Sequence, residues 1–171
     1  PEWGLWVQDW GTAPVVTQTL DNTAGTLAID VTGSGDAAWD VQVFQDGYIT
    51  LEQGKTYKLS VTVMAEADRS INIAFGYGDP YVQYARQNGN AILTTETVVE
   101  FLFTVTMPTH DVKLTFELGS QDGFADGLVT FSNVALQELD AETLIMNGNF
   151  DQMMAPWDTW YQNWGDMPTV T

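Results

Sequence analysis

Three acidic residues are spaced so that they could perform acid–base chemistry. Glu138, Asp140 and Glu142 alternate with Leu139 and Ala141. In a β-strand this alternation would place all three carboxylates on one face, where one could act as a nucleophile and another as a general acid in retaining hydrolysis. The run falls between two strand-rich segments, where acidic linkers are common. We therefore favour a linker and predict that the chain is not an enzyme.

No second catalytic constellation accompanies this run. The sequence contains one histidine, His110, and no cysteine. This composition excludes histidine triads, polyhistidine metal sites, thiol catalysis, disulfides and thiolate metal sites.

Flat aromatic side chains lie beside amide and charged side chains in this sequence. There are seven Trp, six Tyr and eight Phe residues. Indole and phenol rings can stack on the apolar faces of sugars, while amide and charged groups bond to the hydroxyls. Three tyrosines surround a turn at Pro80, with polar side chains nearby. These candidates for ligand contacts are Tyr77, Tyr81, Tyr84, Gln83 and Arg86.

The charge of the chain excludes several partners. Five Lys and Arg residues face 23 Asp and Glu residues, giving a formal net charge of −18. Such a field repels phosphate groups, so we expect neither nucleic acid nor a membrane surface as a partner. Apolar runs are too short for a membrane span. Because the sequence opens on Pro1 without a methionine, we expect it to be a piece of a longer polypeptide.

The hydrophobic pattern is that of β-strands. Apolar and polar residues alternate, and Gly, Pro, Asn and Asp separate the alternating runs. The expected strands are residues 26–31, 39–44, 57–63, 70–77, 98–106, 112–118 and 128–136. Short strands at regular intervals predict an all-β fold, a β-sandwich of two antiparallel sheets.

Two tryptophan-rich segments are related by a constant offset of 154 positions. The residues that coincide are Trp3, Trp6, Gln8, Trp10 and Gly11 with Trp157, Trp160, Gln162, Trp164 and Gly165. A tandem array explains this repeat. We therefore predict one module at residues 1–139, and a linker with the opening of a second repeat at residues 140–171.

The second copy opens with a strand for which the first copy has no equivalent. Residues 144–150 include Leu144, Ile145, Met146 and Phe150. An exposed apolar edge strand invites aggregation. We therefore predict that this strand completes the edge of the first module, or enters a neighbouring chain in a strand-swapped homodimer. The alternative is a frayed tail, against which the apolar content argues.

Several motifs together cover nearly the whole chain. They are Asn147-Gly148-Asn149-Phe150-Asp151, Trp3-x-x-Trp6, Trp39-Asp40-Val41-Gln42, Leu51-x-x-Gly54-Lys55-Thr56-Tyr57, Ala65-x-Ala67-Asp68, Phe116-Glu117-Leu118-Gly119 and Val129-Thr130-Phe131-Ser132-Asn133-Val134. Together they resemble a permuted family 4 carbohydrate-binding module, with relatives in families 9, 16 and 22. The resemblance implies a non-catalytic jelly roll that binds a polysaccharide in an aromatic-lined cleft.

The resemblance also implies site residues and partners. Trp6, Trp39 and Tyr81 match aromatic cleft positions, and Gln42 matches a polar one. The combination is most similar to modules that bind soluble β-1,3-glucan such as laminarin. Such modules are usually part of the same polypeptide as a secreted bacterial glycoside hydrolase, so we expect a secreted or cell-surface location.

One departure from the family concerns a structural calcium ion. The closing strand of the family usually carries an aspartate that helps to hold calcium, where this sequence has Asn133. Asn133 and Asp151 are the candidate oxygen donors, and the resemblance leaves the presence of calcium open. Because calcium prefers six to eight oxygen ligands, a site with one carboxylate would be weak.

Three other functions stay open at this point. Xylan, mannan, cellulose or a mixed-linkage glucan could replace β-1,3-glucan as the ligand. The run from Glu138 to Glu142 resembles the catalytic strand of jelly-roll endo-glucanases, although the chain is shorter than those enzymes usually are. A cell-surface adhesion sandwich that binds protein would have a similar pattern of strands.

Overall fold

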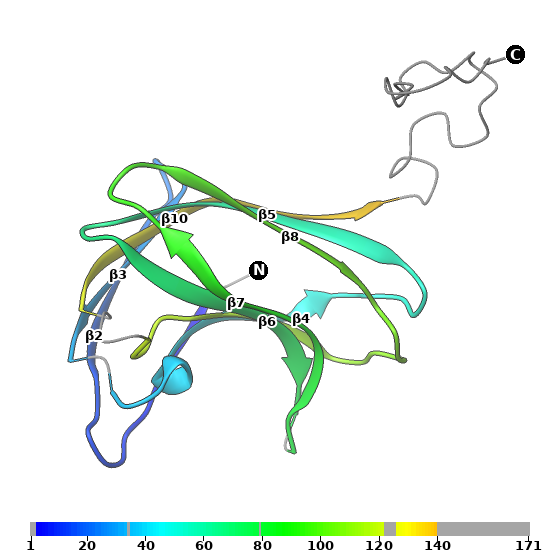
Figure 1. Cartoon of the computed structure of the whole chain (residues 1–171), viewed down its shortest axis with the longest axis horizontal. Helices are drawn as coiled ribbons and strands as arrows, with labels where there is room; N and C mark the ends of the chain where they lie inside the picture. The colour runs from blue at the N-terminus through cyan, green and yellow to red at the C-terminus, as the bar shows by residue number, and fades with distance from the viewer. Residues whose placement is uncertain (1–2, 34, 79, 122–125, 140–171) are drawn as a thin grey trace, which may run out of the picture. The chain divides into compact units, whose positions relative to one another are not determined.

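The computed structural model describes residues 3–33, 35–78, 80–121 and 126–139 (Figure 1). The chain divides into two compact units, Pro1–Glu138 and Leu139–Thr171, and every described residue except Leu139 belongs to the first. The expected second repeat, its strand at residues 144–150 and the candidate calcium ligand Asp151 lie outside the described residues.

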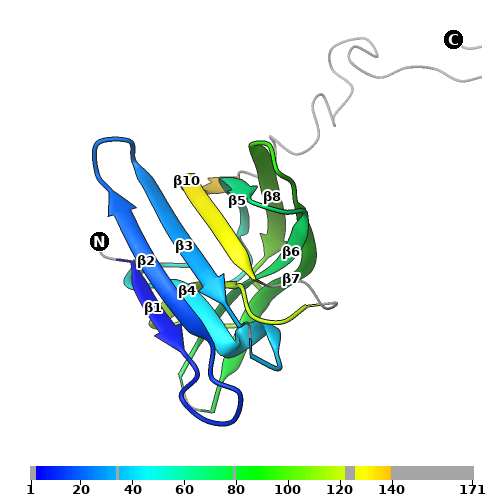
Figure 2. The ribbon, with the colours of Figure 1, turned by 90° about the vertical axis from the view of Figure 1, so that its left-hand side faces the viewer.

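Within the described residues, ten strands form two antiparallel five-stranded sheets, whose arrangement is drawn in Figures 1 and 2. Sheet A contains, in spatial order, β1 (Gly4–Val7), β4 (Val41–Ile49), β9 (Val112–Glu117), β6 (Arg69–Tyr77) and β7 (Val82–Ile92). Sheet B contains β2 (Val15–Asp21), β3 (Thr26–Thr32), β10 (Gly127–Leu139), β5 (Thr56–Ala65) and β8 (Thr97–Thr104). The predicted β-sandwich jelly roll is therefore confirmed, and so are the seven expected strands.

The strands that the sequence pattern did not predict are β1, β2 and β7. In β2 nearly every residue is exposed, so apolar and polar residues do not alternate. In β7 two irregularities in the pairing with β6 interrupt the period of two. A short 3-10 turn, η1 (Ala38–Asp40), precedes β4. The described residues include no helix with the length and apolar character needed to cross a membrane.

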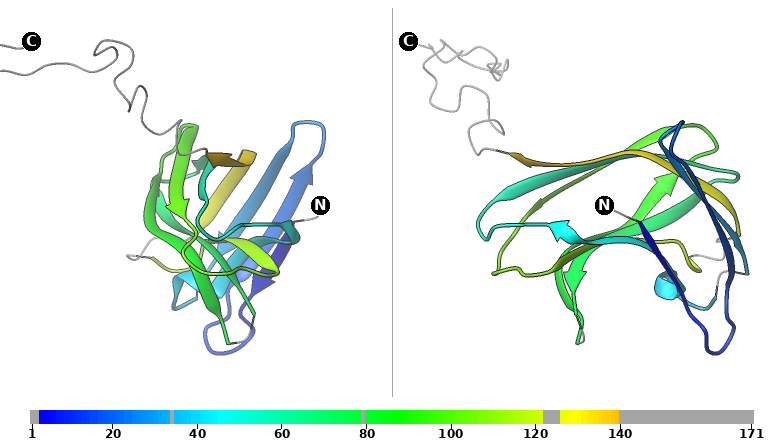
Figure 3. Two further views of the ribbon diagram at one scale, coloured as in Figure 1. Left: turned by 90° about the vertical axis from the view of Figure 1, so that its right-hand side faces the viewer. Right: turned by 180° about the vertical axis from the view of Figure 1, so that it is seen from behind.

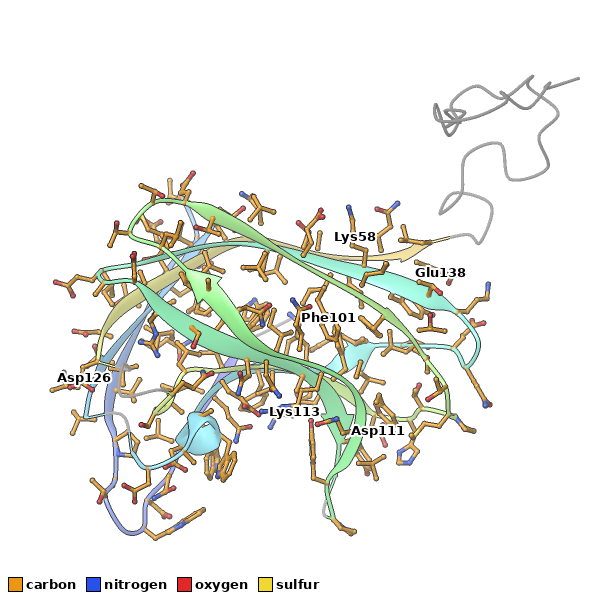
Figure 4. The ribbon with its side chains drawn as sticks, in the orientation of Figure 1. Lys58, Phe101, Asp111, Lys113, Asp126 and Glu138 are labelled. Atoms are coloured by element: carbon orange, nitrogen blue, oxygen red, sulfur yellow. The ribbon has the colours of Figure 1, made fainter. Side chains whose placement is uncertain are left out.

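The two sheets face each other (Figure 3). Alternating side chains from both sheets form the core between them. Phe75 of sheet A packs against Phe101 and Phe103 of sheet B, with ring centroids 6.2 and 4.7 Å away. Phe101 points between the sheets, whereas Lys58 points away from them (Figure 4). Trp3 stacks on Phe116 at 5.8 Å, so this tryptophan packs against the core.

The turn that leads into β4 is built around the buried side chain of Asp40. Its Oδ2 accepts hydrogen bonds from the backbone N–H groups of Asp36, at 2.7 Å, and Ala37, at 2.9 Å. Gly35 has a φ of 75°, and a Cβ atom there would meet Oδ2 at 2.5 Å, so only glycine fits. The Asp40 carbonyl accepts from Gln8 N–H at 2.9 Å, which joins the turn to the end of β1.

Asp40 is therefore expected to be required for this turn. In Asp40→Ala, two N–H groups would lose their acceptor, and the protein should lose about 1–3 kcal/mol of unfolding free energy. Asp36→Ala is the matched control, because the Asp36 side chain is exposed and contributes only its backbone N–H to the turn. Urea denaturation measures both variants. Equal stability of Asp40→Ala and the wild type would contradict this account of the turn.

Candidate functional site

The outer face of sheet A carries a row of aromatic and polar side chains. In β4, Val41 and Val43 are fully buried between the sheets. Gln42 therefore points outward, and directly paired residues of antiparallel strands point the same way. The pairing places Gln42 opposite Trp6 of β1 and Glu117 of β9, and Glu117 opposite Asn72 of β6. One continuous row thus crosses four strands.

Two further rows run parallel to the first. The second row, again read from the strand pairing, is Gly4, Phe44, Thr115, Ala74 and Arg86. The third row is Lys113, Gly76 and Gln83. We call these three rows together the outer face of sheet A.

A nearly buried ion pair lies at the centre of this face. Glu117 is only 5% exposed. The Arg86 guanidinium donates from Nη1 to Oε1 at 2.7 Å and from Nη2 to Oε2 at 2.5 Å. Asn72 Nδ2 also donates to Oε2, at 3.0 Å. The hydrogen bonds to Glu117 raise the pKa of Arg86 above its usual value. The carboxylate and the guanidinium are thus held rigidly and neutralise each other.

Tyr81 lies against Gly76 of the sheet, near this ion pair. A Cβ atom at Gly76 would meet the phenol atoms of Tyr81 at 2.3–2.5 Å, so the ring occupies the space that any other side chain would need. The ring is nevertheless 53% exposed and presents a surface to solvent. Burial raises the pKa of the Tyr81 hydroxyl, and the negative charge of Glu117 adds to this effect, while Arg86 opposes it.

Phe44 also lies against a glycine, Gly4 of the edge strand β1. A Cβ atom at Gly4 would meet the Phe44 ring at 2.4–2.9 Å. Lys113 Nζ lies 4.2 Å from the centroid of this ring and 3.5 Å from Gln42 Oε1. Partial burial lowers the pKa of Lys113, and Asp46 opposes this shift. The face therefore carries two aromatic rings that lie against glycines, Phe44 against Gly4 and Tyr81 against Gly76.

Three indoles lie where β1 ends and β4 begins: Trp6 is half-buried, and Trp10 and Trp39 are exposed. Trp6 contacts Trp10 edge to face, with ring centroids 5.8 Å apart. Trp39 lies in η1, two residues before β4, and is 56% exposed. Gln42 Nε2 donates to the Trp39 carbonyl at 2.9 Å, which connects η1 to the first row. The strand expected at residues 39–44 therefore begins only at Val41, because Trp39 and Asp40 belong to the 3-10 turn, where Trp39 is exposed to solvent.

The structure brings most of the expected ligand contacts together on this face, but not all of them. The residues that it places on the outer face of sheet A or at its edge are Trp6, Trp39, Gln42, Tyr81, Gln83 and Arg86. Tyr84 is 7% exposed, packs in the core and donates its hydroxyl to the His110 carbonyl at 3.1 Å. Tyr77 also packs against the core, and its ring meets His110 at 4.4 Å. These two tyrosines support the sandwich and do not share the outer face.

The sequence pattern did not single out four residues of this face. They are Phe44, Asn72, Lys113 and Glu117. The alternation of β4 could have identified Phe44, because it stands two residues from Gln42. Nothing in the sequence alone indicated that Glu117 pairs with Arg86, since the partners are 31 positions apart.

The candidate calcium ligand Asn133 lies elsewhere, on β10 of sheet B. Its Nδ2 faces Thr62 Oγ1 at 3.4 Å. In the described ranges, no group of three or more His, Cys, Asp or Glu side chains could hold a metal ion. With Asp151 outside these ranges, Asn133 is the one predicted side-chain donor that the structure places. A single amide oxygen does not fit the six to eight oxygens that calcium prefers.

Only one member of the acidic run is described. Glu138, near the end of β10, forms an ion pair with Lys55 Nζ at 2.6 Å on the exposed surface. Asp140 and Glu142 lie outside the described residues. Glu138 is on sheet B and takes no part in the outer face of sheet A.

Comparison with known proteins gives consistent matches. A family model described as "Carbohydrate binding domain" matches residues 3–123. A solved structure described as "CBM4 structure and function" is 25% identical, covers 80% of this chain and 86% of its own, and has a TM-score of 0.69. The second N-terminal cellulose-binding domain of Cellulomonas fimi β-1,4-glucanase C is 22% identical, covers 81% and 86%, and has a TM-score of 0.59. No curated protein matches the chain.

The contact between the Tyr81 ring and Gly76 can be tested directly. Gly76→Ala should displace the ring, so that the pKa of the Tyr81 hydroxyl falls back toward its ordinary value near 10. Titration of the tyrosine Cζ signals by NMR measures this change. Gln83→Ala is the control, because it alters the residue paired with Gly76 and leaves the glycine under the Tyr81 ring unchanged. An unchanged titration in Gly76→Ala would show that the ring does not lie on this glycine.

The central ion pair should contribute to stability. Glu117→Gln leaves Arg86 without its charge partner in a half-buried position, and the loss of unfolding free energy should be about 1–3 kcal/mol. Glu100→Gln breaks the exposed pair with Lys58 and should cost less than about 0.5 kcal/mol. Chemical denaturation compares the two variants. Equal losses would contradict a special role for the Glu117 pair.

Proposed function

Because this chain belongs to the carbohydrate binding domain family CBM_4_9, we propose that it binds a soluble β-glucan chain on the outer face of sheet A, without catalysis. The proposed ligand is β-1,3-glucan of the laminarin type or a mixed-linkage glucan. The observation that carries this proposal is the row of the face in which Trp6, Gln42 and Glu117 stand side by side on neighbouring strands.

The rings and the polar groups of the face would have separate roles. Trp6, Trp39 and Tyr81 would stack on the apolar faces of sugar residues. Gln42 and Asn72 would bond to hydroxyl groups, as would the remaining lone pairs of Glu117. Adjacent strands lie about 4.8 Å apart, so the first row spans roughly 14 Å from β1 to β6. A glucan chain lying across the strands would therefore place several of its sugar residues on the first row at once.

The electrostatics of the face favour a neutral ligand. The charges of Glu117 and Arg86 cancel within the bidentate pair. The chain as a whole carries a formal charge of −18 and would repel polyanions such as acidic polysaccharides. A neutral glucan meets no such repulsion. Its hydroxyl groups can bond to polar groups that the ion pair already holds in place.

The proposal extends to the context of the module. One of the similar solved structures is a cellulose-binding domain of a β-1,4-glucanase. We take this as support for a module that is joined to a glycoside hydrolase and targets it to a polysaccharide outside the cell, either as a secreted protein or at the cell surface.

Affinity electrophoresis tests the proposed function. Gels containing laminarin, lichenan, xylan, glucomannan or hydroxyethyl cellulose would compare the wild type with Trp39→Ala and Tyr81→Ala. We expect a β-glucan to retard the wild type and each variant to bind at least about tenfold more weakly, because a stacking ring is lost. Leu102→Ala, an exposed apolar residue on the outer side of sheet B, is the control and should bind normally.

Other outcomes would overturn parts of this proposal. No retardation in any gel would contradict carbohydrate binding and favour an adhesion module. Retardation that survives both aromatic substitutions would place the site on another face. Release of reducing ends from the same glucans would contradict the non-catalytic assignment and return attention to Glu138.

A further inference from the structure

Strand β7 contains an extra residue close to the central ion pair. Gln87 and Asn90 pair with β6 residues that are two positions apart, although they are themselves three positions apart. Asn88 and Gly89, both exposed, form the resulting bulge. Bulges occur often beside functional sites, where they set the direction of a side chain. The bulge of β7 follows directly after Arg86, the residue that pairs with Glu117.

The backbone of this bulge is held by residues other than Asn88. Gly89 has a φ of 66°, a conformation that favours glycine. Its N–H donates to Asn72 Oδ1 at 3.0 Å. The buried Asn90 side chain donates to the Gln87 carbonyl and to a carbonyl of β6, at 3.1 Å each. A change of the Asn88 side chain should therefore leave the bulge itself in place.

The side chain of Asn88 holds Arg86 at the nitrogen that Glu117 does not contact. Asn88 Oδ1 accepts a hydrogen bond from Arg86 Nε at 2.6 Å. Both Nη atoms donate to Glu117, so all three nitrogens of the guanidinium are bonded. A guanidinium has five N–H groups, and these three bonds use three of them. Among the described residues, the other two N–H groups, one on each Nη atom, have no acceptor.

Arg86 is more accessible to a ligand than the two residues that bond to each other beside it. The Arg86 side chain is 21% exposed, whereas the Glu117 side chain and Asn72 are each 7% exposed. A sugar hydroxyl can accept from an N–H group of Arg86, and the charge of the donor strengthens that bond. A long side chain that is already fixed loses less freedom when a ligand binds, so fixing Arg86 in advance favours binding.

We propose that Asn88 is a positioning residue of the glucan site, which holds the Arg86 guanidinium so that it donates a hydrogen bond to a hydroxyl oxygen of the ligand. This proposal rests on the proposed function, the binding of a glucan on the outer face of sheet A. Asn88 acts through Arg86 and needs no contact with the sugar. Because Glu117 already balances the charge of Arg86, the group that Arg86 recognises is a neutral hydroxyl.

Affinity electrophoresis of three variants of the full chain tests this proposal, with the glucan that retards the wild type. Asn88→Ala should bind about three- to tenfold more weakly, the effect of one lost hydrogen bond. Asn88→Asp keeps an acceptor oxygen and should bind within about twofold of the wild type. Asn22→Ala is the matched control, because it changes an exposed asparagine in the turn between β2 and β3 of sheet B, and it should bind normally. The melting temperature of Asn88→Ala should stay within about 2 °C of the wild type.

The Nε–H signal of Arg86 in NMR spectra measures the effect of Asn88 on Arg86 without any ligand. This proton should exchange with water at least about tenfold more slowly in the wild type and in Asn88→Asp than in Asn88→Ala. Equal exchange in the wild type and Asn88→Ala would overturn the proposal, because Asn88 would then not hold the guanidinium.

The binding results distinguish this proposal from the proposed function. If the wild type binds no glucan, the proposed function is wrong and this proposal falls with it. If the wild type binds and Asn88→Ala binds equally well, only the role of Asn88 is overturned. Equal weakening in Asn88→Ala and Asn88→Asp would also overturn it, because the acceptor oxygen would then not matter. A melting temperature of Asn88→Ala more than about 5 °C below that of the wild type would overturn it in favour of a purely structural role.

Discussion

Glu117 stands almost without solvent on the outer face of sheet A, and a carboxylate in such a position is stable only when charge and hydrogen bonds surround it. Arg86 satisfies both of its oxygens, and Asn72 adds a third hydrogen bond. These partners come from β9, β7 and β6, so the register of three strands must be correct for the carboxylate to be satisfied. The ion pair therefore forms only when these strands pair in the correct register, and that register also sets which side chains share the outer face.

Glycine provides the second constraint on this face. Gly76 and Gly4 leave the space on the sheet that the rings of Tyr81 and Phe44 occupy. A ring held against the sheet in this way loses little entropy when a ligand stacks on it, since its position is set before the ligand arrives. The same residues explain why the face is aromatic yet well ordered. Its rings are held by backbone shape and its polar groups by mutual hydrogen bonds.

The sequence was sufficient for the fold and for part of the face. Alternation such as that of Val41, Gln42 and Val43 predicts which side of a strand is buried, and the structure agrees. It could not reveal that Tyr84 turns inward to His110, because the irregular pairing of β7 with β6 shifts the alternation there. Nor could it predict the η1 turn that exposes Trp39, which depends on contacts of Asp40 with the backbone. Long-range pairing, such as that of Glu117 with Arg86, required the structure.

The most direct test of glucan binding on the outer face of sheet A is an NMR titration of the isotope-labelled protein with laminarin oligosaccharides. If the oligosaccharide binds on the outer face of sheet A, the indole N–H signals of Trp6 and Trp39 and the side-chain amide signals of Gln42 and Asn72 should shift together with one saturation curve. Signals from the outer side of β5 and β8 should stay in place. Shifts confined to sheet B, or no shifts at saturating oligosaccharide, would contradict the assignment of the outer face of sheet A as the binding site.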